Sequence, residues 1–202
     1  MGITPLCGAE ATFSGFSKDP SRSEERGTKG RGELVNIIYI NIKKSPHNLG
    51  SLSSERAGGE ADIREPRGIR NNNPLNIRRS GDKWQGLKAQ QEDREFFQFS
   101  EMKWGWRAAF RLLCHTYYEK HKLRTIRALI TRWAPPKENN TEAYIRRVTD
   151  RIGIGPDTVL GEPLSQPAQW MMIAMVMAIV ECGTTQLDYL SMLKGFSLAT
   201  ND

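Results

Sequence analysis

The sequence predicts a mainly α domain of the α+β class, with a buried central helix and a small β element. Apolar residues recur at helical spacing in several segments after residue 100. The segment from Trp170 to Val180 is apolar on every side, so a helix there must lie inside the fold. Alternation in the aromatic segment Arg94 to Phe99 predicts a short strand within the β element near residues 75 to 99.

The chain divides by composition into residues 1–65 and a globular domain, residues 66–202. Residues 1–65 are rich in Gly, Ser, Glu, Lys and Arg and show no helical period, which is typical of a disordered segment. A misassigned start of translation is the alternative. The β-branched segment Leu34 to Ile42 could form a strand, although an isolated strand is not stable.

The bounds of the predicted helices follow from residues that can cap a helix N-terminus and from residues that end a helix. Ser100 is positioned to cap a helix that runs to about His121. A second helix spans Thr125 to Trp133 and stops before Pro135. The apolar stripes of these two helices comprise Ala109, Phe110, Leu113 and Tyr117, then Ile126, Leu129, Ile130 and Trp133.

Three further helices complete the domain. Thr141 is predicted to cap the third, which stops at Gly153. Ser165 is predicted to cap the fourth, the central helix, which ends at Gly183. The fifth is predicted over Gln186 to Lys194.

Charge and cysteine content limit the kinds of partner that this protein can have. The net charge of +6 and pI of about 9.3 favour a polyanionic partner, either nucleic acid or an anionic cell-wall polymer. Three cysteines without close spacing predict neither a disulfide framework nor a zinc site, and we expect no metal or cofactor.

The apolar run in the central helix is shorter than the roughly 20 residues that a membrane span needs. The N-terminus lacks the basic and apolar regions of a signal peptide, so we expect synthesis in the cytoplasm.

The segment Arg67 to Arg78, with the sequence RGIRNNNPLNIR, carries the strongest functional signal. Asn competes with the backbone for hydrogen bonds and Pro removes a donor, so the segment is predicted to be a loop. A rigid, amide-rich loop beside tryptophans suits an uncharged, hydroxyl-rich ligand such as a sugar. Alternatively, the asparagines satisfy the loop's own backbone through Asx-turns.

Glu181 is the candidate general acid. It is the first acid after the apolar run and lies just before the Gly183 stop. The partial negative charge of the helix C-terminus and the apolar surroundings both favour a protonated carboxyl, which protonation of a glycosidic oxygen requires. The alternative is that Glu181 faces solvent where the helix ends.

The residues from Arg67 to Leu160 resemble a group of phage and prophage proteins, some identified as virion-associated structural proteins and others as lysozyme-like cell-wall hydrolases. The pieces that carry the resemblance are RGIRNNNPLNIR, KWQGL, REFFQF and RWAPPKENNTEAYI. Leu75 departs from that pattern, because the relatives have Gly there. If that Gly holds a positive φ or lets a sugar approach the backbone, Leu75 weakens activity.

A weaker resemblance is to the autolysin-type glucosaminidases. Their E-S-G helix end, N-N-x-F-G-I-K segment and W-x-G turn are similar to AIVECG, NNPLNIR and KWQGL here. The first piece follows the other two in this chain, so the order resembles a circular permutation.

The resemblance implies a lysozyme-like domain that cleaves the β-1,4 glycan bonds of peptidoglycan. The resemblance implies that Glu181 is the general acid. It also implies that Trp84 stacks on a sugar and that Tyr144 lies beside the acid. It implies that Asn72, Asn73 and Asn76 line the floor of the cleft or hold its loop. For the tryptophans at 104, 106 and 133 the alternative is core packing at helix ends, which we favour for Trp133 and for at least one of the other two.

The second carboxylate is left open, as is the choice between a hydrolase and a lytic transglycosylase. Its candidates are Asp93, Glu95, Glu101, Glu138 and Glu142, of which Glu142 begins a helix and is expected to stay ionised.

The partners expected are peptidoglycan strands and phage virion components, with the protein a monomer that acts at the cell wall after phage-type release or as part of a virion. The first alternative is an inactive virion structural or glycan-binding protein. The second is a nucleic-acid-binding protein that uses the arginines at 64, 67, 70, 78 and 79, although phosphate contact does not explain the asparagines.

Overall fold

The computed structural model describes residues 65–201. The extension predicted at residues 1–65 lies outside this range except for its last residue. The described part is mainly helical, which confirms the predicted fold class. Its helices are α2 (Arg67–Arg70), α3 (Met102–Phe110), the π-helix η2 (Arg111–Lys120), α4 (Ile126–Trp133), α5 (Thr141–Ile152), α6 (Pro167–Cys182) and α7 (Tyr189–Thr200).

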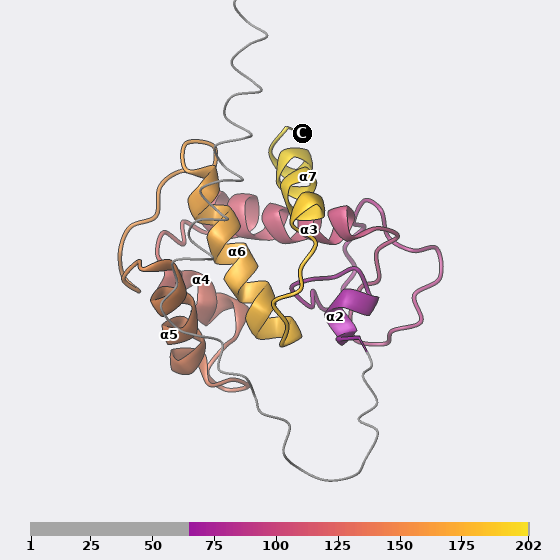
Figure 1. The fold of residues 1–202 in the computed structure, drawn as a ribbon, viewed down its shortest axis with the longest axis horizontal. Coiled ribbons are helices and arrows are strands. Elements are labelled where there is room, and N and C mark those ends of the chain that lie inside the picture. Colours follow the sequence, from indigo (N-terminus) through magenta and orange to yellow (C-terminus); the bar gives the residue numbers. More distant parts are fainter. Residues whose placement is uncertain (1–64, 202) are drawn as a thin grey trace, which may run out of the picture.

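Helix α6 forms the centre of the fold, as its apolar composition predicts. Figure 1 shows it running diagonally across the domain, with α4 and α5 on one side and α2 near its C-terminal end. Trp170, Ile173 and Met177 are fully buried within it. Burial of such side chains contributes about 2 kcal/mol each, so this helix supplies much of the driving force for folding.

The predicted helix ends are correct where a specific side chain or glycine sets them. The Thr125 hydroxyl accepts a hydrogen bond from Ala128 N and begins α4. Gly153 and Gly183 end α5 and α6 in the left-handed conformation, with φ of 68° and 65°.

Three predicted N-caps are wrong by one residue. The capping residues are Glu101, Asn140 and Gln166, in place of Ser100, Thr141 and Ser165. The Ser100 hydroxyl instead donates to the carbonyl of Gly86, which ties the start of α3 to the preceding loop.

The last helix begins later and ends later than predicted. The Asp188 carboxylate accepts from Ser191 N and sets its start. The helix continues past Lys194 because it crosses α3 closely at Gly195. An ideal Cβ there would lie 2.4 Å from the Cβ of Trp106, so only glycine permits this crossing.

The predicted strand at Arg94 to Phe99 is not formed. Two isolated antiparallel bridges, Arg78 with Phe96 and Leu87 with Phe99, are the β pairing in the described residues. The ladder is interrupted because Asn73 Nδ2 takes the Phe97 carbonyl, at 2.9 Å. The Asn73 side chain thus replaces the backbone partners that Ile77 N and Phe97 O would have in a continued ladder.

The helix predicted up to about His121 changes its winding at residue 111. In η2 the backbone bonds reach five residues back, as from His121 N to Thr116 O at 3.0 Å. Residues five apart lie about 140° apart on an α-helix, but π-type bonding brings them towards one face. Leu112 and Tyr117 consequently line the same cleft.

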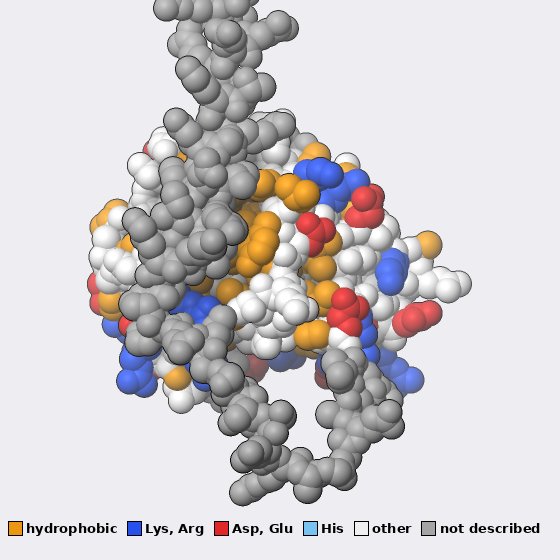
Figure 2. Space-filling model, in the orientation of Figure 1, with side chains coloured by type: hydrophobic (Ala, Val, Ile, Leu, Met, Phe, Trp, Pro, Cys, Tyr) orange, Lys and Arg blue, Asp and Glu red, His pale blue; other side chains and the backbone are white. Residues whose placement is uncertain are grey.

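The surface shows charged and apolar side chains side by side. Figure 2 shows acidic and basic groups interspersed on the visible face, with hydrophobic side chains exposed around α6 and α7. No helix in residues 65–201 has the length and hydrophobicity to cross a membrane.

Candidate functional site

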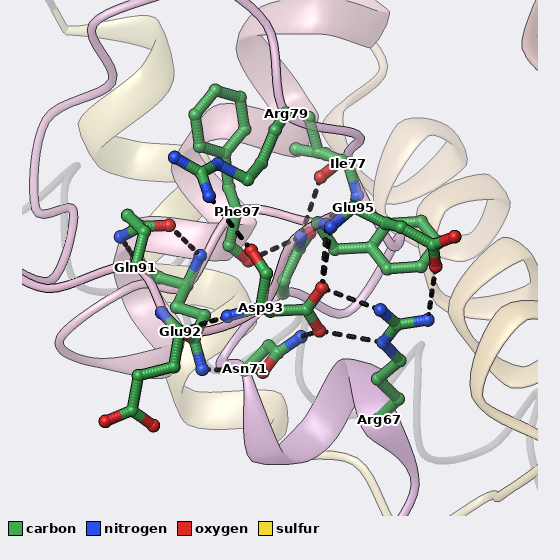
Figure 3. Close-up of polar contacts among 12 residues, drawn as sticks. Arg67, Asn71, Ile77, Arg79, Gln91, Glu92, Asp93, Glu95 and Phe97 are labelled. Carbon is green, nitrogen blue, oxygen red and sulfur yellow. Dashed lines mark hydrogen bonds and ion pairs between the residues drawn. The ribbon is translucent and has the colours of Figure 1, made fainter.

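An ion-pair network anchors the loop that follows α2. Arg67 donates to both carboxylate oxygens of Asp93, at 2.7 Å each, and to Glu95 at 2.6 Å. The Asn71 amide adds a 2.7 Å bond to Asp93, and Figure 3 shows these groups converging on that carboxylate. The Arg67 guanidinium, assisted by Asn71, holds the pKa of Asp93 well below its usual range. The loop is therefore fixed by a charged anchor.

The asparagines predicted at 72 and 73 hold the loop together. Asn73 is fully buried, and its amide bonds to Ile77 N, Ile77 O and Phe97 O at 2.8–3.0 Å. Asn72 adopts a left-handed φ of 51° and donates to the Phe99 carbonyl at 3.0 Å. Their amides are thus turned to the backbone of the β element. A direct substrate-binding role for either stays a prediction.

Asn76 joins the loop to the end of α6. Its Nδ2 donates to the backbone carbonyl of Glu181 at 3.2 Å and lies 3.5 Å from that residue's Oε2. The carbonyl belongs to the last turn of α6, which leaves it without a partner in its own helix. Asn76 has a φ of 47°, which Asn tolerates better than most residues. It therefore acts as a side-chain cap of α6.

Two neighbouring contacts tighten this junction. The Cys182 thiol donates to the Pro74 carbonyl at 3.3 Å. Burial, and then the charge of Glu181, raise the pKa of that thiol to about 11, so it keeps its proton. A Cβ on Gly68 would lie 2.7 Å from Cys182 Sγ and 2.8 Å from Asn76 Oδ1. The junction therefore has no room for a larger residue in α2.

The Glu181 carboxyl is held by two aromatic donors. Trp133 Nε1 donates to Oε1 at 2.9 Å, and the Tyr144 hydroxyl donates to the same oxygen at 3.0 Å. Burial, and then the negative charge of Glu181, raise the pKa of Tyr144 well above its ordinary value, so its O–H is retained. Oε1 is thereby engaged from α4 and α5 together, and Oε2 is the freer oxygen.

A cleft of about 380 Å³ opens beside this carboxyl. Its lining includes Glu181 and Asn76 together with Arg78, Phe96, Tyr117 and Trp133. The predicted pair of Glu181 and the asparagine-rich loop therefore meets in one cleft. Tyr144 reaches Glu181 from the buried side. Asn72, Asn73 and Trp84 are not among the residues that line the cleft, and Trp84 packs against the core.

Comparison with known proteins places the chain among phage proteins. No protein-family model matches it. Protein P5 of Pseudoalteromonas phage PM2 is 38% identical to it over 133 residues, which are 64% of this chain and 79% of that protein. The chain belongs to the Protein P5 family. This P5-family chain is therefore phage-associated, in agreement with the phage character predicted from its motifs.

Sequence reasoning missed two features of the P5-family site. Trp133 packs against the core as predicted, but it is half-buried and its indole nitrogen also donates to the Glu181 carboxyl. Phe96 and Tyr117 were not assigned to the cleft. Helical spacing shows that Trp133 and Tyr117 face inwards, but it does not show that the end of α6 lies against them.

Most of the candidate second carboxylates are engaged elsewhere. Asp93 and Glu95 pair with Arg67, Glu101 pairs with Lys103, and Glu142 pairs with Arg127. Glu138 is the candidate that lines the cleft, and Asp82 joins it there although its position in sequence did not indicate a role.

Leu75 does not have the backbone strain expected of a side chain that occupies a positive-φ glycine position. Among described non-glycine residues, positive φ occurs at Asn72, Asn76 and Lys122, so Leu75 has an ordinary backbone. Its side chain is fully buried in the core. Leu75 therefore carries no positive-φ strain in this chain, and its effect on sugar approach and activity stays a prediction.

A larger hollow of about 760 Å³ lies away from this carboxyl, between α3, α6 and α7. Its lining is mainly apolar, with exposed leucines at 164 and 190, and it contains none of the predicted site residues. No cluster of metal-ligating side chains occurs in residues 65–201. The cleft beside Glu181 is thus the place where the candidate general acid, polar groups and aromatic rings meet.

Proposed function

We propose that this P5-family protein is a lysozyme-like, peptidoglycan-degrading glycosidase with Glu181 as its general acid. The observation that carries the proposal is the position of the Glu181 carboxyl, which lines a cleft and is held by Trp133 and Tyr144. Two donors on one oxygen fix the orientation of the carboxyl before substrate arrives. Such preorganisation is a main source of catalytic power.

The two carboxyl oxygens would have different tasks in this proposal. Oε1 accepts from two N–H or O–H groups, so a proton on this acid resides on Oε2. Protonation of the glycosidic oxygen by Oε2 releases the leaving sugar as the bond to the anomeric carbon breaks. Loss of either aromatic donor would let the carboxyl rotate and would misplace this proton.

If the reaction uses a second carboxylate, the candidates are Asp82 and Glu138. Both line the cleft with Glu181. Ser80 donates to Asp82 at 2.7 Å, which fixes that side chain. Either acid would activate water or form a glycosyl intermediate, giving hydrolysis. A lytic transglycosylase would instead use the substrate's own hydroxyl and need only Glu181.

Sugar binding in this cleft would rest on aromatic faces and amides. Phe96, Tyr117 and Trp133 supply apolar rings, and Asn139 adds an amide from the loop before α5. This assignment moves the stacking role from Trp84 to rings that line the cleft. Such a mixture of apolar walls and few polar groups is usual for small-ligand sites.

A virion structural protein that binds glycan without cleaving it is the second candidate. The phage relative favours a virion component, and action at the wall from a virion fits both candidates. The nucleic-acid alternative receives less support, because Arg67 is opposed by Asp93 and Glu95 and Arg78 faces the cleft.

Analysis of the products from purified peptidoglycan tests the proposal. We expect soluble muropeptides, with reducing ends from a hydrolase or 1,6-anhydro ends from a transglycosylase. Binding to the insoluble wall without any release of fragments would favour the structural protein. Retention on DNA that weakens steeply with salt would favour the nucleic-acid binder.

A further inference from the structure

Arg78 is the one basic side chain among the described residues that line the cleft. Its backbone is anchored by the bridge to Phe96, directly after the asparagine-rich loop. Its guanidinium carbon lies 5.9 Å from the centre of the Phe96 ring. The charged group therefore projects from a fixed point on the wall that also carries an aromatic ring.

The charge of Arg78 is weakly opposed. Its nearest carboxylate oxygen, on Glu138, lies 4.0 Å away, and the two side chains are 75% and 68% exposed. Exposed pairs of this kind contribute little free energy. Arg67, in contrast, is bound at 2.7 Å and 2.6 Å by Asp93 and Glu95. Arg78 can thus exchange its loose partner for an anion on a ligand.

The acids of the cleft make this arginine decisive for charged ligands. Asp82 and Glu138 line the same space, and their negative charges would repel an anionic saccharide. A guanidinium offers paired N–H donors that match the two oxygens of a carboxylate. An acidic ligand is therefore accepted only where it can meet Arg78.

We propose that Arg78 binds a carboxylate carried by the glycan, so that the cleft takes the acidic, lactyl-bearing polymer in preference to a neutral N-acetylglucosamine polymer. This inference rests on the proposed glycan-binding function. In peptidoglycan the carboxylate belongs either to a free lactyl group or to the stem peptide attached there. Both sources offer a carboxylate on the substituent that the sugar carries at its 3-oxygen, although the peptide's carboxylates lie further from the ring.

Calorimetric binding tests this selectivity without turnover. The full-length protein carrying Glu181→Gln is titrated with three saccharides of equal length: a neutral chitin oligosaccharide, a peptidoglycan oligosaccharide stripped of peptides by an amidase, and the same oligosaccharide with its peptides. We expect the acidic saccharides to bind about tenfold more tightly than the neutral one, as one charge-assisted pair allows. Preference for the stripped form identifies the lactyl carboxylate, and preference for the intact form alone identifies the peptide.

Matched charge variants complete the experiment. Arg78→Gln should abolish the preference, while Arg94→Gln, which removes the same charge from an exposed residue outside the cleft lining, should keep it. Equal effects of the two variants, or equal binding of neutral and acidic saccharides, would overturn the inference. The glycosidase proposal is tested separately with Glu181 intact, because cleavage of both polymers at equal rates would sustain it and overturn the role of Arg78. Absence of binding to any saccharide contradicts the inference whatever the cleavage assay shows.

Discussion

The side-chain amide of Asn76 caps the backbone carbonyl of Glu181, although the two residues lie 105 positions apart in the sequence. The contact holds the C-terminal end of α6 against the asparagine-rich loop, and both line the cleft. The same short segment therefore sets both the stability of α6 and the position of the proposed acid.

Substitution of Asn76 separates these contributions. Asn76→Gly loses the amide but accepts the positive φ, whereas Asn76→Ala loses the amide and must adopt a left-handed backbone. The left-handed conformation costs a residue with a Cβ roughly 1–2 kcal/mol. We expect the alanine variant to be less stable than the glycine variant by about 1 kcal/mol after the entropy cost of glycine. Chemical denaturation measures the difference, and equal stability of the two would argue against the strained position.

Trp133→Phe tests the positioning of the carboxyl. The ring is retained but the N–H that binds Glu181 Oε1 is lost. We expect kcat to fall about tenfold, as the loss of one well-placed hydrogen bond implies, with little change in KM. Trp104→Phe is the matched control, because Trp104 does not line the cleft. Equal kcat values for the two variants would contradict a positioning role.

Asp93→Asn tests the charged anchor of the loop. Because the folded-state pKa of Asp93 lies below its unfolded value, its contribution is fully present above about pH 5 and is lost as the pH falls through and below about 4. We expect the variant to lose about 2 kcal/mol at pH 7, the scale of charged hydrogen bonds. Its stability should also decline less than the parent's between pH 5 and pH 3. Glu92→Gln, at the exposed neighbouring residue, should leave that pH dependence unchanged.

Leu75→Ala distinguishes a packing role from a functional one. The side chain is fully buried, so its removal should cost about 3 kcal/mol. Activity per folded molecule should remain that of the parent, because Leu75 is outside the cleft lining. Thermal unfolding and an active-site titration measure the two quantities. An increase in specific activity on truncation would show that Leu75 restricts the site after all.

Local chemistry explains which structural features could be predicted. Thr125 accepts from a backbone N–H three residues on, and Gly153 and Gly183 adopt conformations that other residues avoid, so these helix ends are encoded locally. Contacts between residues distant in the sequence determine the features that could not be predicted. The strand at Arg94 to Phe99 is lost to the side chain of Asn73, and the register of α7 depends on its crossing with α3.

The candidate site shows the same division. The sequence alone points to Glu181 through its place at the end of an apolar helix and to Asn76 through the amide-rich loop. Trp133 was not assigned to the site, because a tryptophan at core spacing looks the same whether its N–H meets a carboxylate or not. The π-helical winding that turns Leu112 and Tyr117 to one side also has no local signature in the sequence.

The most direct measurement is the rate at which purified peptidoglycan releases soluble muropeptides with the parent protein and with Glu181→Gln. The Gln side chain keeps an oxygen that can accept from Trp133 and Tyr144, so thermal unfolding should show the variant folded. We expect the release rate to fall at least about 100-fold, the usual scale of general acid catalysis. Equal release by the two proteins, or no release by a folded parent, would contradict it.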